Sequence, residues 1–145
     1  MTGGYTGKIL NIDLKTQIIK TEKTDLDSAR DFIGAKGLGA KILFERLPKK
    51  TNPLSPENIL MFTTGPLTGT TAQTSGRGTV VTKSPQTNLF LDSHFGGFFA
   101  AEIKKTGYDI IIINESSFFS IFLGFLLFSK FLYLFNYIII YFNIY

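Results

Sequence analysis

The sequence predicts an α+β fold with a mainly antiparallel β-sheet and short helices. Short apolar or alternating segments bounded by Gly, Pro and Asn are typical of strands, and other segments carry apolar residues at helical spacing. Together these segments follow the order β-β-α-α-β-β-β-α-β. The chain has 145 residues, which is room for one modest domain with a single core. We expect this domain at residues 1–114, because residues 115–145 form a separate apolar tail.

The first part of the chain predicts a hairpin and a short helix. Residues 5–14 alternate apolar and polar side chains toward their end, which is strand periodicity. A polar turn separates them from a second strand that begins at Ile18. Asp25 or Asp27 can cap the short helix that follows, and Gly34 can end it.

A glycine-rich run at residues 34–39 predicts a flexible joint whose glycines close turns between helices. The segment after it has apolar residues at helical spacing, and Pro48 ends that helix. Its apolar residues are Leu38, Ile42, Leu43 and Leu47.

The rest of the domain predicts three strands, a helix and a final strand. The strands are at residues 59–62, 79–82, 89–91 and 110–113, and the helix is at residues 98–106. In this helix we expect Phe99, Ala100 and Ile103 to face inward. Lys104 and Lys105 come late in the helix, where positive charge suits the helix dipole.

Composition and charge exclude several functional classes. The formal net charge is +4, and the basic residues are scattered in runs of two at most. A nucleic-acid surface shows a basic cluster, so we expect no nucleic-acid partner, whereas a mildly basic pocket for a phosphorylated cofactor fits. The sequence has no cysteine and therefore offers no thiolate for zinc or for an iron–sulfur cluster. The N-terminus lacks the features of a signal peptide, so we expect the cytoplasm.

Two glycine-rich segments are candidates for ligand binding. The first, Gly34-x-x-Gly37-x-Gly39, lacks the spacing and the preceding strand of a dinucleotide fingerprint. The second, residues 65–78, is rich in Thr and Ser and carries Arg77 near its end. Its backbone N–H groups, hydroxyls and guanidinium suit a phosphate group. A surface loop with a solvated arginine is the alternative interpretation.

A third candidate lies at the start of the last predicted helix. His94, the only histidine, precedes Gly96 and Gly97, and two glycines at a helix N-terminus let a ligand approach the backbone closely. A lone histidine is more often a structural hydrogen-bonding residue. Asp92 and Ser93 adjoin it, but the members of a catalytic triad converge from separate parts of a chain, which argues against a hydrolase. The residues alone therefore predict an anion-binding α+β domain.

A series of short sequence blocks takes the interpretation further. The blocks are residues 5–10 (YTGKIL), 32–41 (FIGAKGLGAK), 52–58 (NPLSPEN), 64–70 (TGPLTGT), 75–77 (SGR), 80–85 (VVTKSP), 96–99 (GGFF) and 105–109 (KTGYD). In residue identity, order and spacing they resemble the N-terminal part of the aldehyde:ferredoxin oxidoreductase family. The resemblance covers about residues 4–113.

The resemblance implies an N-terminal base domain on which a tungsten or molybdenum bis-pterin cofactor rests. By position, Arg77 would contact the cofactor, and the backbone at Gly96 and Gly97 would pack against it. His94 also falls among the implied cofactor-binding residues, although the family often has asparagine at this place.

The sequence departs from the family pattern in two residues and in its extent. Phe95 replaces a smaller residue, and Ala100 stands where glycine is usual, which leaves less room for close approach to the backbone. The family's second pterin loop, its cluster cysteines and its substrate-pocket acid–base groups have no counterpart here. In the family, an aldehyde is oxidised to a carboxylic acid and electrons pass through a [4Fe–4S] cluster to ferredoxin. We therefore predict part of a cofactor seat, without catalytic or metal-ligating residues, that is inactive alone.

The tail has two interpretations. From residue 118 it consists mostly of Phe, Leu, Ile and Tyr, with Lys130 as its only charge. Codons of A and T alone can specify nearly all of these residue types, so our preferred interpretation is a frameshift near Asn114 and a non-functional gene remnant. The alternative is a membrane-anchored binding protein for a phosphorylated ligand. As a helix, residues 118–145 would be about 42 Å long, enough for a hydrocarbon core of about 30 Å.

Overall fold

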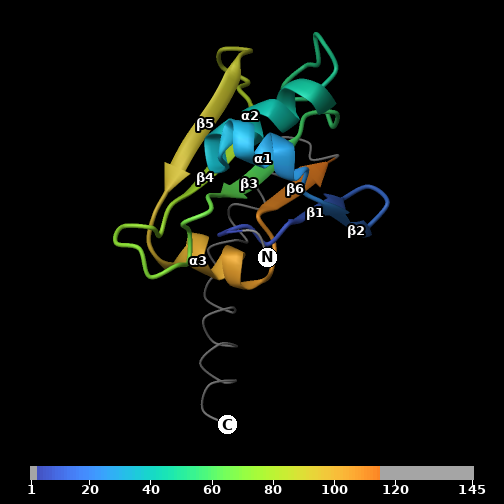
Figure 1. Ribbon diagram of the computed structural model, residues 1–145. Coiled ribbons are helices and arrows are strands. Elements are labelled where there is room, and N and C mark those ends of the chain that lie inside the picture. Colours follow the sequence, from blue (N-terminus) through green and yellow to red (C-terminus); the bar gives the residue numbers. More distant parts are fainter. Residues whose placement is uncertain (1–2, 115–145) are drawn as a thin grey trace.

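A six-stranded sheet and three helices make up residues 3–114, the part of the chain that the structure, a computed structural model, describes (Figure 1). The elements are β1 (Lys8–Asp13), β2 (Ile18–Lys23), α1 (Leu26–Phe32), α2 (Ala35–Arg46), β3 (Leu60–Thr64), β4 (Gly78–Lys83), β5 (Phe90–Phe95), α3 (Phe98–Lys105) and β6 (Ile110–Asn114). The strand order is β2-β1-β6-β3-β4-β5, and only β1 and β6 pair in parallel. The predicted α+β fold with a mainly antiparallel sheet is confirmed for these residues.

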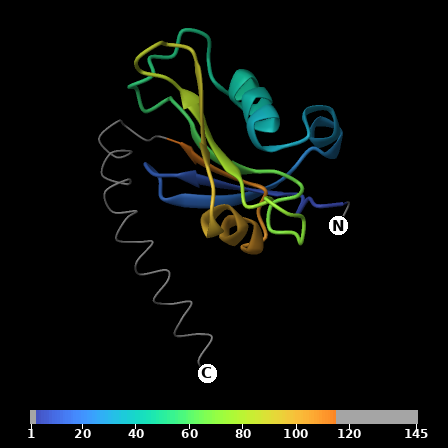
Figure 2. The same ribbon diagram turned by 90° about the vertical axis from the view of Figure 1, so that its left-hand side faces the viewer.

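Helices α1 and α2 lie on one face of the sheet, and α3 lies on the other (Figure 2). Successive side chains of a strand point to opposite faces, so alternate residues of the central strands face α2. These residues form the core together with one side of α2. Its members include Ile9, Leu38, Ile42, Leu43, Met61, Val81, Ile110 and Ile112.

The local signals in the first part of the chain are confirmed. The β1–β2 turn is held by Asp13, whose Oδ1 accepts the backbone N–H groups of Lys15 and Thr16, both at 2.9 Å. Asp25 caps α1, because its side chain accepts the N–H of Asp27 at 3.2 Å. Such caps satisfy donors that a helix leaves free at its first turn.

The predicted flexible joint at residues 34–39 is wrong, because α2 begins at Ala35 and contains its glycines. A Cβ on Gly39 would lie 2.9 Å from Cγ2 of Val81 on β4, and a Cβ on Gly37 would lie 2.3 Å from the carbonyl oxygen of Phe32. Real Cβ atoms do not come this close to their neighbours. The glycines therefore allow close packing of α2 on the sheet and on the end of α1.

Helix α3 packs against the opposite face of the sheet. Ala100 and Ile103 are buried, as predicted, and the ring of Phe99 meets the ring of Phe62 edge-on at a centroid distance of 6.3 Å. Strand β5 is longer than the predicted strand at residues 89–91 and includes His94, which the sequence analysis placed just before the last helix.

Within residues 3–114, no helix has the length and apolar character needed to cross a membrane. The frameshift and membrane-anchor interpretations concern residues 115–145, which lie outside the described residues, and so does the predicted boundary between domain and tail.

Candidate functional site

Two loops meet at the end of β4 and β5 that lies beside α3 (Figure 1). The first joins β3 to β4 through residues 65–77, and the second joins β5 to α3 through residues 96–97. We call them the glycine loops. A Cβ on Gly76 would lie 2.9 Å from the carbonyl oxygen of Gly97, closer than real Cβ atoms come. The two backbones therefore touch, and glycine at position 76 permits the contact.

Beside this contact, the ring of Phe95 covers Gly78. The two residues pair across β4 and β5, and a Cβ on Gly78 would lie 2.4 Å from Cζ of Phe95. The ring also packs against Phe62 and Phe99, at centroid distances of 6.4 Å and 5.2 Å. Phe95 is thus a packing residue on the α3 side of the sheet. Ala100 is fully buried, so its methyl group is not exposed at the glycine loops.

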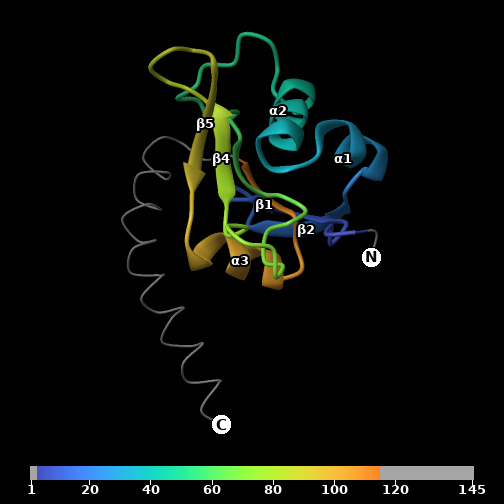
Figure 3. The same ribbon diagram turned by 60° about the vertical axis from the view of Figure 1, so that its left-hand side comes forward.

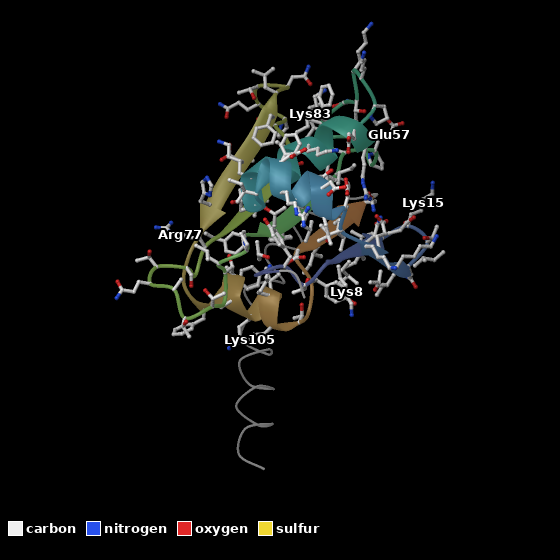
Figure 4. All side chains as sticks on the ribbon, viewed as in Figure 1. Lys8, Lys15, Glu57, Arg77, Lys83 and Lys105 are labelled. Atoms are coloured by element: carbon white, nitrogen blue, oxygen red, sulfur yellow. The ribbon has the colours of Figure 1, made fainter. Side chains whose placement is uncertain are left out.

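The Arg77 side chain runs past Gly96. A Cβ on Gly96 would lie 3.9 Å from both Cδ and Nε of Arg77, which is ordinary van der Waals contact. The side chain is exposed and points away from the sheet (Figure 4), and it has no hydrogen bond or ion pair among residues 3–114. Its backbone is held in place, because the carbonyl oxygen of Arg77 accepts the hydroxyl of buried Thr68 at 2.8 Å. An ordered loop therefore presents an unpaired guanidinium beside Gly96.

The start of α3 is open above Gly97. This residue has φ 79° and ψ −155°, a conformation that favours glycine, and a Cβ built on it would meet nothing within 4 Å. No side chain caps the helix here. The helix dipole gives this uncapped end of α3 partial positive charge, which favours an anion nearby.

His94 faces the other side of the sheet, toward α2. Its Nδ1 lies 3.1 Å from the Thr79 hydroxyl, and its Nε2 lies 3.1 Å from Oδ2 of Asp92. Asp92 in turn pairs with Lys36 of α2 at 3.1 Å. Both ring nitrogens therefore have partners, as expected for a structural histidine. Ser93 points to the opposite face of β5, which removes the geometry of a triad.

A buried ion pair between Lys104 and Asp109 anchors the first glycine loop, and the sequence analysis did not predict it. The two side chains are only 9% and 2% exposed. Asp109 also accepts the backbone N–H groups of Thr6 at 3.0 Å and Gly7 at 2.8 Å, and Lys104 donates to the carbonyl oxygen of Gly65 at 3.3 Å. Lys104 lies in the last turn of α3, as predicted, and its side chain is in addition buried against Asp109.

The carboxyl groups with shifted pKa values lie away from the glycine loops. A hydrogen bond from Arg46 lowers the pKa of Glu22, and a hydrogen bond from Ser28 lowers the pKa of Asp25. Among residues 3–114, no three His, Cys, Asp or Glu side chains come together in a group that could hold a metal ion. The structure thus brings together Arg77 with residues 96–97, and it turns His94 away from them.

Comparison with known proteins matches this domain to one family. The family model of the aldehyde ferredoxin oxidoreductase N-terminal domain matches residues 9–121. The tungsten-containing aldehyde ferredoxin oxidoreductase of Pyrococcus abyssi is 46% identical over 111 residues, which are 77% of this chain and 18% of that protein. The WOR-like subunit of the aliphatic sulfonate oxidoreductase of Pyrococcus furiosus is 37% identical over 113 residues, 76% of this chain and 18% of that protein.

A solved structure agrees with these matches. It is the active-site complex BamBC of benzoyl coenzyme A reductase with 1,5-dienoyl-CoA, with a TM-score of 0.78 and 43% identity over 81% of this chain. The match again covers 18% of the other chain. The present chain therefore spans less than a fifth of the length of these relatives.

Proposed function

This chain belongs to the aldehyde ferredoxin oxidoreductase family through its N-terminal domain, and from this membership we propose that it forms part of the seat of a tungsten- or molybdenum-pterin cofactor. The glycine loops would contact the phosphate groups and the polar ring edges of the pterin. One observation carries the proposal: the Arg77 guanidinium is unpaired among residues 3–114 and lies along Gly96, next to the uncapped start of α3.

The residues present fit an anionic group of this kind. An exposed guanidinium can make a two-pronged contact with phosphate, and a helix N-terminus attracts negative charge through free backbone N–H groups. The space above Gly97 leaves room for a ligand to approach the backbone. Thr68 holds the Arg77 backbone, so binding would order little more than the side chain. When bound, the cofactor supplies the metal centre at which the substrate is oxidised.

We propose that the complete enzyme oxidises an aldehyde to a carboxylic acid. The aldehyde and one water molecule give the acid, two protons and two electrons, and the electrons pass through a [4Fe–4S] cluster to ferredoxin. The name of the Pyrococcus abyssi relative supports the aldehyde and ferredoxin in this reaction, and the cluster follows from the resemblance alone. The present sequence contains no cysteine, so the cluster ligands would come from another part of the enzyme.

The substrate would also be selected outside this domain. One relative is named for aliphatic sulfonates, and the matching solved structure holds a dienoyl-CoA. Domains similar to this one thus occur in proteins that are named for different substrates. We expect the glycine loops to bind the cofactor and to leave substrate choice to later segments. A cytoplasmic location stays a prediction.

Pyrophosphate binding tests the role of Arg77. Isothermal titration of the full chain with pyrophosphate should give binding that Arg77→Lys weakens about tenfold, because an ammonium cannot reproduce the guanidinium fork. Arg30→Lys is the matched control, since Arg30 is also exposed and lies on α1, and it should leave the affinity unchanged. Equal affinities of the wild type and Arg77→Lys would contradict the assignment of Arg77.

A further inference from the structure

A groove on the α2 side of the sheet lies far from the glycine loops. It has a volume of about 820 Å³ and lies between the C-terminal half of α2, the segment after it and the β4–β5 connection. We call it the α2 groove. It includes Lys83, at the end of β4 opposite Gly78. Its larger apolar lining residues are Phe32, Leu43, Phe44, Leu47, Leu89 and Phe90. Phe44 is 85% exposed and Leu89 is 68% exposed, and an exposed apolar groove is typical of an interaction surface.

The rim of the α2 groove is basic. Its charged lining residues are Lys41, Glu45, Lys49, Lys50 and Lys83. Glu45, the only carboxylate that residues 3–114 contribute to the lining, is already paired with Lys41 at 2.5 Å. Neither Lys49 nor Lys50 has an ion pair among residues 3–114, and Figure 4 shows Lys83 next to α2. A complementary occupant therefore carries carboxylates beside its apolar surface.

The layer structure indicates a helix as the occupant. Helix α2 packs mainly on β4 and β3, whereas β5 is the edge strand of the sheet. Figure 3 shows α2 beside β4, with the upper end of β5 farther from it. Parallel or antiparallel helices pack with their axes about 8–10 Å apart. The α2 groove lies where the next helix of this layer would sit, with Phe44 on one wall and Leu89 and Phe90 on the other.

We propose that the α2 groove receives an amphipathic helix with carboxylates beside its apolar stripe, supplied by the part of the enzyme that lies beyond this domain in its longer relatives. The matched region is 18% of the Pyrococcus abyssi protein, so most of that polypeptide lies outside it. Exposed apolar side chains on a domain of a larger enzyme are buried where its other domains pack. The proposal goes beyond the cofactor seat and does not depend on it.

A small amphiphilic ligand would also match the apolar lining and the basic rim of the α2 groove, but it fits the shape of the groove less well. Small-molecule sites bury most of the ligand surface within walls that are themselves largely formed. Here the walls are open, because Phe44 and Leu89 expose most of their surface. The apolar stripe of a helix would cover these exposed side chains, so the geometry favours a polypeptide.

The test uses the full chain and overlapping peptides of about 20 residues, long enough for about 30 Å of helix. The peptides cover the part of the Pyrococcus abyssi oxidoreductase outside the matched region, and fluorescence anisotropy measures their binding. Binding should be confined to a few neighbouring peptides with net negative charge and apolar residues at helical spacing. Their affinity should fall as salt is added. Leu89→Asp and the double variant Lys49→Glu/Lys50→Glu should each weaken binding about tenfold or more.

Matched variants on the β1–β2 hairpin provide the controls. Ile19 is 65% exposed, so Ile19→Asp matches Leu89→Asp, and Lys15→Glu/Lys20→Glu matches the double lysine variant. Both controls should leave the affinity within about twofold of the wild type. The proposal is overturned if no peptide binds, if the bound peptides are basic, or if the controls weaken binding equally. Binding of dodecanoate, or a dimer of this chain, that Leu89→Asp abolishes would also overturn it, in favour of a lipid or of a second copy.

Discussion

Replacement of Lys104 by methionine is expected to destabilise the fold by about 3 kcal/mol. The Asp109 side chain is 2% exposed, so the change leaves a buried carboxylate without its counterion. Removal of one partner from a buried ion pair typically costs about 3–5 kcal/mol. We take the lower end, because the carboxylate keeps the N–H groups of Thr6 and Gly7. Methionine retains the apolar stem that lies against Gly69, so lost packing adds little.

Urea unfolding of the full chain, followed by far-ultraviolet circular dichroism, measures this loss. The midpoint should fall without a change in the slope of the transition. Lys105→Met is the matched control, because Lys105 is the next residue of α3 and pairs with Glu102 at 2.7 Å, but is 65% exposed. Exposed ion pairs contribute about 0–1 kcal/mol, so the control should lose less than about 1 kcal/mol.

A double variant shows whether the effect belongs to the pair. Lys104→Met/Asp109→Asn removes both charges, and its loss should be clearly smaller than the sum of the losses of the two single variants. The reasoning is refuted if Lys104→Met loses less than about 1 kcal/mol or if the two single losses simply add. Either result would show that water solvates the pair as it does on the surface.

Three further predictions follow from the same structure. Gly39→Val should destabilise the fold by about 1–3 kcal/mol in the same urea titration, because even a Cβ there lies 2.9 Å from Cγ2 of Val81. Arg46 lowers the pKa of Glu22, so the stability from this contact is present above the ordinary glutamate pKa of 4.5 and is lost as pH falls through the lowered value. Glu22→Gln should therefore reduce the loss of stability on acidification, and an unchanged pH profile would contradict this. The purified chain should not oxidise aldehydes with ferredoxin or a viologen as acceptor; turnover above a metal-free control would show this expectation to be wrong.

The sequence predicted every strand of the described sheet, because each strand has a local signal. Apolar residues alternate or cluster over a few positions, and turn residues bound them. The glycines of α2 were misinterpreted, because tertiary packing, and not the local backbone, requires them. Gly37 lies against the end of α1, and Gly39 lies against the side chain of Val81. The local sequence pattern does not reveal such neighbours. Glycine within a helical period can therefore indicate close packing rather than a joint.

The candidate site was only partly predictable. Their glycine-rich segments made Arg77 and Gly96 candidates for ligand binding, and the resemblance assigned them to a cofactor. The structure places them next to each other, and their role toward a cofactor stays a prediction. The Lys104–Asp109 pair was missed, because a lysine late in a helix is usually solvated, and its burial depends on a residue beyond the next turn. The available signal was a lone aspartate directly before the apolar strand β6, since a charge at the edge of a buried strand needs a partner.

Asp109 links sequence blocks that lie far apart in the chain and together carry the family resemblance. Its carboxylate holds the N–H groups of Thr6 and Gly7, within the block at residues 5–10. Its carbonyl oxygen accepts both the N–H and the hydroxyl of Thr64, at 2.9 Å and 2.8 Å, where the first glycine loop begins. Further along that loop, the Thr68 hydroxyl fixes the carbonyl oxygen of Arg77. The start of the chain at residues 6–7 and the first glycine loop thus share one buried anchor, Asp109, directly before β6.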